Sequence, residues 1–341
     1  MSVTEAAKDD YARLVENVIF SLLHRKASPN ELTRWQNRLR QGMSANQFLE
    51  AVLTGEEYKK LSPVVPKYRT GHYYSPIVDP AFAAGHVEKI DFNQKSLPGI
   101  KIDDEAMVKL WRSFEKFLKP RPFPIEETPG HRYWFGNRAY AFGDGTVLHC
   151  MLRHIKPKRM IEVGSGYSSA CTLETAERFL DEDISLTFID PRPKLLNQLF
   201  SVAEPKRKVE IIGSIVQDIP LETFDVLQAG DVLFIDSTHV MKTASDVTYE
   251  FLEILPRLKP GVHVHIHDIF WPFEYPTRWS LDDNRSWNEI YALRAFLAFN
   301  DAFEITFFND YFHRFHKDEL VRSAPWLNRG AGGGSIWLRR K

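Results

Sequence analysis

The chain has few cysteines, no excess of charge of either sign and no long apolar run, and each absence narrows its class. Two cysteines, Cys150 and Cys171, in 341 residues argue against a disulfide framework and indicate a reducing compartment. Lys and Arg number 44 against 45 Asp and Glu, so the net charge of −1 gives no general attraction to nucleic acid or an anionic membrane. No apolar run has the length of a membrane span, and residues 1–10 do not read as a signal peptide. We expect a cytoplasmic protein that binds neither nucleic acid nor a membrane.

Residues 1–60 have the pattern of a small helical bundle. Apolar residues keep helical spacing between Tyr11 and Leu22, and Ser28 and Ser44 open two capping boxes. Residues 23–58 resemble a short helical domain of unknown function related to phycobilisome linkers. The segment holds no cluster of catalytic side chains, so we assign it to recognition or assembly, through a second copy of the chain or a partner protein. Residues 61–124 follow as an aromatic strap, either a linker or a substrate-covering loop, and a helix.

The most informative stretch is the turn after the apolar strand at residues 160–163. Its Gly164-Ser165-Gly166 step allows a tight turn with a ligand close to the backbone, and we expect Ser168 and Ser169 to cap the next helix. A dinucleotide site would require a third glycine where Ser169 stands. Glu162 at the strand end would repel a pyrophosphate but suits a cation. The turn therefore favours S-adenosylmethionine over NAD.

The next two strands also end in residues that suit an adenosine ligand. Residues 185–189 lead into Asp190, whose carboxylate can accept hydrogen bonds from both ribose hydroxyls. Residues 208–213 lead into Ile215, Val216 and Gln217. We expect the two apolar side chains to sandwich an adenine ring and Gln217 to bond its edge.

Two later strands bring acidic residues and histidines to the same edge. Residues 231–236 end in Asp236, followed by His239, and the run 262–270 carries three alternating histidines before Asp268. Two carboxylates with His239 or His267 could hold Mg²⁺, or Zn²⁺, Fe²⁺ or Mn²⁺. We interpret His263 and His265, deeper in the strand, as packed and hydrogen-bonded core histidines.

Residues 125–341 resemble class I S-adenosylmethionine-dependent methyltransferases, in particular the metal-assisted O-methyltransferases such as catechol and macrolide-sugar O-methyltransferases. The resemblance is carried by residues 162–168 and 213–220. It implies an α/β fold with a Rossmann-like seven-stranded sheet beside the N-terminal all-α module. It also implies a base at His239, acting with Asp236 and Asp268, and a divalent cation, Mg²⁺ by analogy, on Asp236, Asp268 and His267. The cofactor residues that it implies are Glu162, Gly164, Ser165, Gly166, Tyr167, Ser168, Asp190, Val216, Gln217 and Asp236.

The expected reaction is methyl transfer from S-adenosylmethionine to a hydroxyl of a small molecule such as a sugar, a glycan unit or a natural product. Such a displacement needs an acceptor oxygen deprotonated by a base, a metal or both. An aromatic insertion with Trp279 and Trp287 should overhang the reacting centre. Two alternatives stay open: a non-catalytic binding or assembly protein on the same fold, and a metal-dependent hydrolase or oxygenase that uses Asp236, His239, His267 and Asp268.

Overall fold

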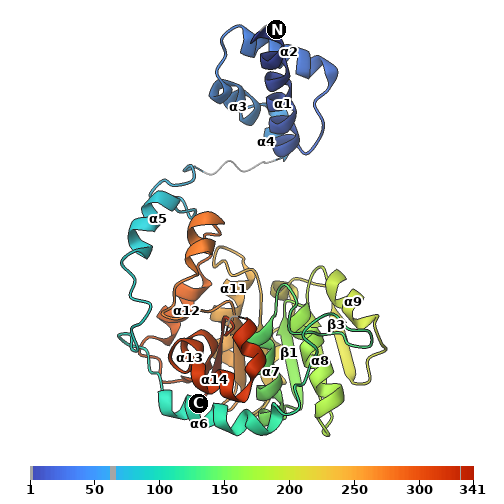
Figure 1. Cartoon of the computed structure of the whole chain (residues 1–341), viewed down its shortest axis with the longest axis vertical. Coiled ribbons are helices and arrows are strands. Elements are labelled where there is room, and N and C mark those ends of the chain that lie inside the picture. The colour runs from blue at the N-terminus through green and yellow to red at the C-terminus, as the bar shows by residue number, and fades with distance from the viewer. Residues whose placement is uncertain (1–2, 62–66, 331) are drawn as a thin grey trace. The chain divides into compact units, whose positions relative to one another are not determined.

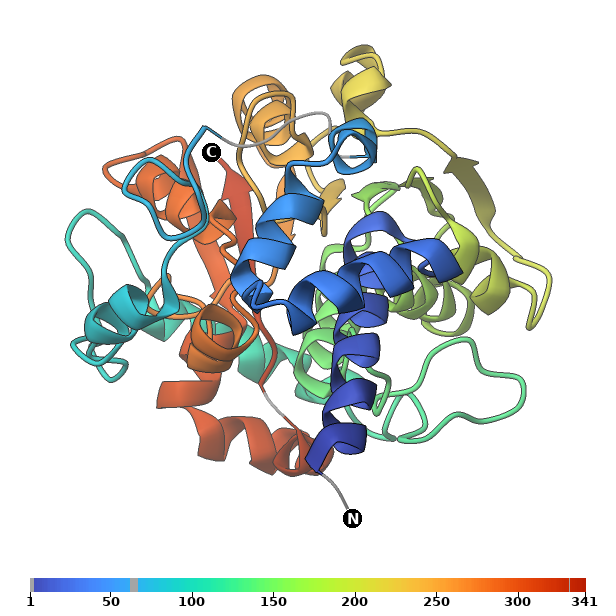
Figure 2. The same ribbon diagram turned by 90° about the horizontal axis from the view of Figure 1, so that it is seen from above.

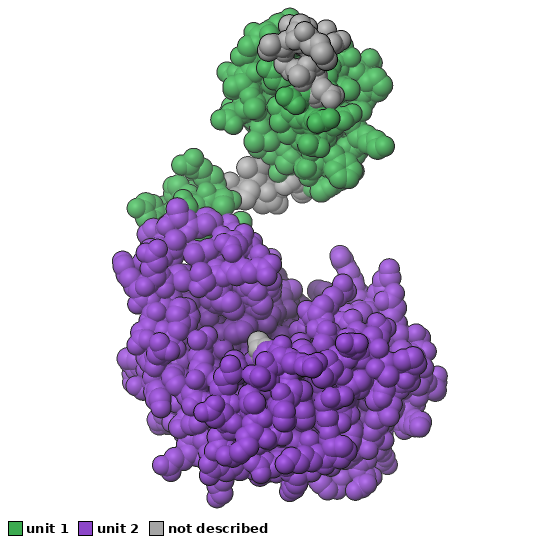
Figure 3. Space-filling view, in the orientation of Figure 1, with its two compact units in different colours: residues 1–79 green, residues 80–341 purple. Residues whose placement is uncertain are grey.

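The computed structural model describes residues 3–61, 67–330 and 332–341, and it divides into two compact units, residues 1–79 and residues 80–341 (Figure 3). The boundary falls inside the predicted strap, of which residues 62–66 lie outside the described residues. The second part of the strap folds with the larger unit and forms α5 (Pro80–Val87) and α6 (Asp104–Phe114). Its inclusion has a packing reason, because α6 buries Met107, Trp111 and Phe114 and contacts strand β6.

The first unit is a helical bundle with its own apolar core. Both predicted capping boxes form, Ser28 with Glu31 and Ser44 with Gln47, and each supplies partners for backbone N–H groups at a helix start. The helices are α1 (Val3–Leu23), α2 (Pro29–Arg40), α3 (Ala45–Leu53) and α4 (Glu56–Leu61). The buried apolar side chains are Val15, Ile19, Leu23, Trp35, Leu39, Phe48 and Val52.

The second unit is built on a seven-stranded sheet of order β3-β2-β1-β4-β5-β7-β6, which confirms the predicted fold class. The first five strands run parallel, and β7 pairs antiparallel with both β5 and β6. The strands are β1 (Arg159–Val163), β2 (Ser185–Ile189), β3 (Lys208–Ile212), β4 (Val232–Ile235), β5 (His263–His267), β6 (Phe303–Phe308) and β7 (Ser335–Arg340).

Helices cover both faces of this sheet (Figures 1 and 2). The two cysteines lie in helices as predicted, Cys150 in α7 and Cys171 in α8, and both are buried free thiols. None of the helices in the described ranges is long and apolar enough to cross a membrane. The remaining α-helices are α7 (Phe142–Ile155), α8 (Tyr167–Phe179), α9 (Lys194–Phe200), α10 (Glu222–Asp225), α11 (Asp246–Tyr249), α12 (Glu289–Leu297), α13 (Asn309–Phe315) and α14 (Lys317–Ser323).

The parallel strands bring their carboxyl ends to one edge of the sheet, where α/β proteins bind their ligands. Backbone hydrogen bonds tie the ends together: Gly164 N–H donates to the carbonyl of Ile189 at 2.9 Å, and Asp236 N–H donates to that of Val163 at 2.8 Å. Strand β5 stops at His267, earlier than predicted, because Asp268 has a left-handed backbone conformation with φ of 55°.

Candidate active site

The turn between β1 and α8 requires its first glycine for packing and leaves space at its second. Gly164 has φ of 82°, and a Cβ there would lie 1.8 Å from the carbonyl oxygen of Asp236. A Cβ on Gly166 would meet only Leu195 Cδ2, at an ordinary 3.5 Å. Protein packing therefore explains Gly164 but not Gly166, whose small size leaves room for a ligand beside the backbone.

Glu162, at the end of β1, is fully buried beneath this turn. Its Oε1 accepts hydrogen bonds from the hydroxyls of Ser168 at 2.6 Å and Ser169 at 2.8 Å, while its Oε2 has no partner among the described residues. Burial raises the pKa of Glu162 to about 8, although the two serine hydroxyls oppose the shift. A nearby cation would favour the ionised form.

The same contacts correct one prediction about the helix start. Gly166, rather than a serine, is the N-cap residue of α8. The Ser169 hydroxyl accepts from Gly166 N–H at 3.1 Å, but both serine hydroxyls donate to Glu162. These serines therefore hold a buried carboxylate as well as the turn.

A pocket of about 360 Å³ opens beside the turn, and five of the ten predicted cofactor residues line it. Asp190 is oriented by the Ser165 hydroxyl at 2.6 Å and by Arg192 N–H at 2.6 Å. Val216 is buried in the wall of this pocket. The pocket lining includes Gly164, Asp190, Ile215, Val216, Gln217, Asp236, Ser237 and Lys242.

Gln217 lines the pocket, but its amide is already bonded to the chain. Its Nε2 donates to the carbonyl oxygen of Ala244 at 2.8 Å. One Nε2 hydrogen is thus used within the chain, where it connects the loop after β3 to the loop before α11. The contact with an adenine edge stays a prediction, for the second Nε2 hydrogen or for Oε1.

His239 forms a buried pair with Glu289. Its Nδ1 lies 2.8 Å from Glu289 Oε2, and its Nε2 faces Asp268 at 3.5 Å and Asp236 at 3.6 Å. Burial lowers the pKa of His239, but the hydrogen bond to Glu289 and the nearby carboxylates outweigh it and raise the pKa to about 9. The free protein therefore holds His239 mainly as a cation at neutral pH, with Nε2 directed at both aspartates.

Glu289 is the site residue that the sequence reasoning missed. It stands 50 residues after His239, at the first position of α12, where an acidic residue is ordinary because it complements the helix dipole. The backbone N–H groups of Asn288 and Glu289 both donate to the carbonyl of His239 at 3.1 Å. These bonds hold His239 in its left-handed conformation, with φ of 61°.

The predicted metal ligands lie close together, but their arrangement does not form a metal centre. His267 Nε2 lies 3.4 Å from Asp268 Oδ1. Asp236 and Asp268 both face His239 Nε2, at 3.6 and 3.5 Å. Within the described ranges, no set of three or more His, Cys, Asp or Glu side chains is positioned to hold a metal ion. A divalent cation on Asp236, Asp268 and His267 is therefore not supported by the donor geometry.

Of the two deeper histidines of β5, His265 is buried as predicted but lacks the expected hydrogen bonds, whereas His263 is only half-buried and lines a pocket. Its ring stacks on Phe234 with centroids 3.9 Å apart, and neither ring nitrogen has a partner among the described residues. Burial holds the pKa of His265 well below its usual value. The neutral ring is consistent with a role in the core rather than in proton transfer.

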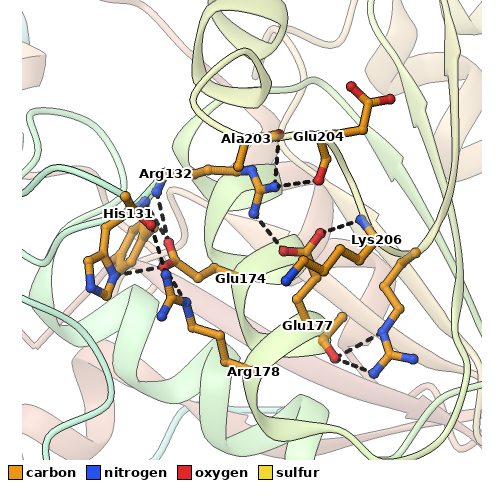
Figure 4. Close-up of polar contacts among 12 residues, drawn as sticks. His131, Arg132, Glu174, Glu177, Arg178, Ala203, Glu204 and Lys206 are labelled. Atoms are coloured by element: carbon orange, nitrogen blue, oxygen red, sulfur yellow. Dashed lines mark hydrogen bonds and ion pairs between the residues drawn. The ribbon is translucent and has the colours of Figure 1, made fainter.

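Glu174 of α8 binds the segment that precedes α7 (Figure 4). Its carboxylate accepts from the backbone N–H groups of Arg132 at 3.0 Å and Tyr133 at 2.9 Å. The next residue, Trp134, packs edge-on against Tyr167, with ring centroids 5.2 Å apart. Further partners in this network are His131, Arg178, Glu177 and Ala203. The network thereby positions an indole beside the first residue of α8.

The strand order and the site at the carboxyl ends of β1, β2, β4 and β5 define a class I methyltransferase fold. Residues 161–269 match a family model described as a methyltransferase domain. The match extends from β1 to just beyond β5 and contains the turn, Asp190, His239 and Asp268.

Individual relatives are distant. An uncharacterised protein of Archaeoglobus fulgidus is 28% identical over 165 residues, which cover 46% of this chain and 72% of that protein. The O-methyltransferase TomG of Streptomyces achromogenes, solved in complex with SAM, is 18% identical with a TM-score of 0.38, covering 71% of this chain and 92% of TomG. An O-methyltransferase of Bacillus cereus, solved with SAH, is 14% identical with a TM-score of 0.37, over 70% and 92% of the two chains.

Proposed function

We propose that the chain transfers a methyl group from S-adenosylmethionine to a hydroxyl oxygen of a small molecule. The observation that carries this proposal is that a cofactor turn and an oriented histidine lie at the same edge of the sheet. The glycine turn follows β1 and covers the buried carboxyl of Glu162, whose Oε2 has no partner among the described residues. His239, which is hydrogen-bonded to Glu289, follows β4. The methyltransferase family match over residues 161–269 supports the reaction class.

The residues present fit an adenosine ligand with a cationic centre. The pocket of about 360 Å³ is open, Gly166 leaves room beside the backbone, and Glu162 Oε2 lacks a partner among the described residues. Asp190 would hold the ribose, and Val216 would pack against the base. When bound, S-adenosylmethionine supplies an electrophilic methyl group. The remaining cofactor residues would be Glu162, Gly164, Ser165, Tyr167, Ser168, Gln217 and Asp236.

His239 is suited to remove the acceptor proton. The Glu289 carboxylate at 2.8 Å favours the tautomer with a proton on Nδ1, which leaves the lone pair of neutral His239 on Nε2. The hydroxyl proton passes to Nε2, and the resulting imidazolium is stabilised by Glu289, Asp268 and Asp236. Because the pKa of His239 is about 9, the neutral form that accepts the proton becomes more abundant as the pH rises.

The two alternatives from the sequence receive less support. A purely structural use of the fold would be favoured by a pocket filled with side chains, whereas this one is open. A metal-dependent hydrolase or oxygenase would use His239 as a ligand, but Glu289 and two aspartates engage it as an ion pair. We also propose that the helical bundle at residues 1–60 serves recognition or assembly.

The test begins with the titration of S-adenosylmethionine into the full chain by calorimetry. Hydroxylated sugars and phenols are then screened for conversion of the cofactor to S-adenosylhomocysteine. With a working acceptor, His239→Ala should lower turnover about 10²–10⁴-fold and leave cofactor affinity nearly unchanged. His263→Ala is a control, since His263 lies at the start of β5, away from the carboxyl edge. Tighter binding of NAD than of S-adenosylmethionine would refute the assignment.

A further inference from the structure

The insertion between β5 and α12 places two indoles and a guanidinium beside His239. The ring of Trp287 lies 4.5 Å from that of His239, and Trp279 meets Trp287 edge-on at 5.5 Å. The guanidinium carbon of Arg285 lies 3.9 Å from the Trp279 ring centroid and 4.7 Å from that of Trp287. The histidine and the arginine therefore contact the same indole, Trp287.

Arg285 is held in place mainly by stacking, and part of its hydrogen-bonding capacity remains free. Its Nε and Nη2 lie 3.3 and 3.2 Å from Asp283 Oδ2, which is long for a charge-assisted bond. Its Nη1 donates no hydrogen bond to the part of the chain that the structure describes. The backbone N–H of Arg285 donates to the carbonyl of Trp279 at 3.0 Å, which fixes the loop. The side chain is 32% exposed, so a ligand can reach it.

We propose that the acceptor is a hydroxylated ring that carries an anionic substituent, a carboxylate or a phosphate. This inference rests on the proposed function and assigns its substrate class. Indole surfaces at Trp279 and Trp287 suit a ring, and a guanidinium with free donors suits a carboxylate or phosphate. The hydroxyl lies toward His239, and the anionic group lies toward Arg285.

Electrostatics at the reacting end support this orientation. Asp236, Asp268 and Glu289 surround His239, so an anionic substituent there would face three carboxyl groups. The loop at residues 278–285 carries two arginines and two aspartates, Asp282 and Asp283, and its described ion pairs join Asp283 to Arg285 and Arg278. The stacked guanidinium of Arg285 is therefore the cationic group that lies directly against both indoles.

Arg278 offers a matched control. It belongs to the same loop and lies near the same acid, with Nε 3.8 Å from Asp283 Oδ1. Its side chain is 77% exposed, and the described cation–ring contacts involve Arg285 rather than Arg278 at both indoles. Replacing either arginine by glutamine removes the same charge from the same loop, so a difference between the variants reports position rather than net charge.

The experiment measures binding to the full chain saturated with S-adenosylhomocysteine, by calorimetry. The probes are matched pairs: 3,4-dihydroxybenzoate with catechol, and glucuronate and glucose 6-phosphate with glucose. We expect the wild type to bind at least one acid about tenfold or more tightly than its neutral partner, as a charge-assisted bond provides. Arg285→Gln should abolish that preference, Arg285→Lys should restore part of it, and Arg278→Gln should retain it. Whether glucuronate or glucose 6-phosphate binds more tightly shows whether the site prefers a carboxylate or a phosphate.

Several results would overturn the inference. These are equal binding of acid and neutral partner, no binding of any acid, and a preference that survives in Arg285→Gln while its melting temperature is unchanged. If Arg285→Gln does not fold, Arg285→Lys decides. A preference for the acid as strong in Arg285→Lys as in the wild type would contradict a role for the planar guanidinium. Failure of the wild type to bind S-adenosylhomocysteine would refute the proposed function itself. Cofactor binding without an acid preference would refute only the substrate class.

Discussion

The charge of Glu289 sets the pH at which His239 becomes a base, and Glu289→Gln removes that charge while keeping an acceptor oxygen. In the wild type, burial favours the neutral imidazole, but Glu289, Asp268 and Asp236 raise the pKa of His239 to about 9. Turnover that depends on neutral His239 should therefore rise with pH and level off above about 9. In Glu289→Gln the burial remains, so the inflection moves to lower pH.

The size of the displacement follows from the contact at 2.8 Å between Nδ1 and Oε2. A hydrogen bond to a charged group contributes roughly 1.5–3 kcal/mol, and one pH unit corresponds to about 1.36 kcal/mol. The inflection should thus lie about 1–2 pH units lower in Glu289→Gln. The plateau rate should also fall, because the imidazolium formed on proton transfer loses its partner.

The assay is formation of S-adenosylhomocysteine at saturating cofactor and acceptor between pH 5.5 and 10. Glu250→Gln is the matched control. Glu250 is equally buried and accepts from the Ser237 hydroxyl at 3.0 Å, and burial holds its pKa well above the usual value, so glutamine resembles its neutral form. An inflection that stays in place in Glu289→Gln, or moves as far in Glu250→Gln, would refute the reasoning.

The same pKa predicts a stability effect. A histidine whose pKa is raised on folding stabilises the fold below its ordinary pKa of 6.5, and that contribution is lost as the pH rises through about 9. The melting temperature of the wild type should therefore decline across this interval more steeply than that of His239→Gln. Parallel curves for the two proteins would argue against a raised pKa.

Three further predictions concern the cofactor turn and the domain boundary. Asp190→Ala should weaken S-adenosylmethionine binding by about 1.5–3 kcal/mol in calorimetry, and unchanged affinity would exclude a ribose contact. Gly164→Ala should lower the melting temperature because its Cβ would meet Asp236 O at 1.8 Å, whereas Gly166→Ala should fold normally but bind the cofactor more weakly. A larger loss of stability in Gly166→Ala than in Gly164→Ala would contradict the conclusion that Gly166 faces the ligand. A chain starting at Pro80 should bind the cofactor as the full chain does, and loss of binding with intact circular dichroism would count against the two-unit division.

Most of the fold was predictable because its signals are local. Apolar runs and capping residues marked the strands from β1 to β5 and the helices α2 and α3, and both capping boxes are confirmed. Since parallel strands align their carboxyl ends, the meeting of Asp190, Asp236 and Asp268 at one edge followed from sequence order and fold class.

The tertiary structure decided which polar atoms become partners, because those pairs join residues that are distant in the chain. Glu289 meets His239 across 50 residues, Gln217 turns to Ala244, and Glu174 binds backbone N–H groups of a segment before α7. Periodicity and capping report what a residue does to its own helix or strand, and they contain no record of such pairings. The sequence by itself determined the strands of the sheet and the residue types at its edge. Packing decided the charge of His239, and it left the Oε2 atom of Glu162 without a partner among the described residues.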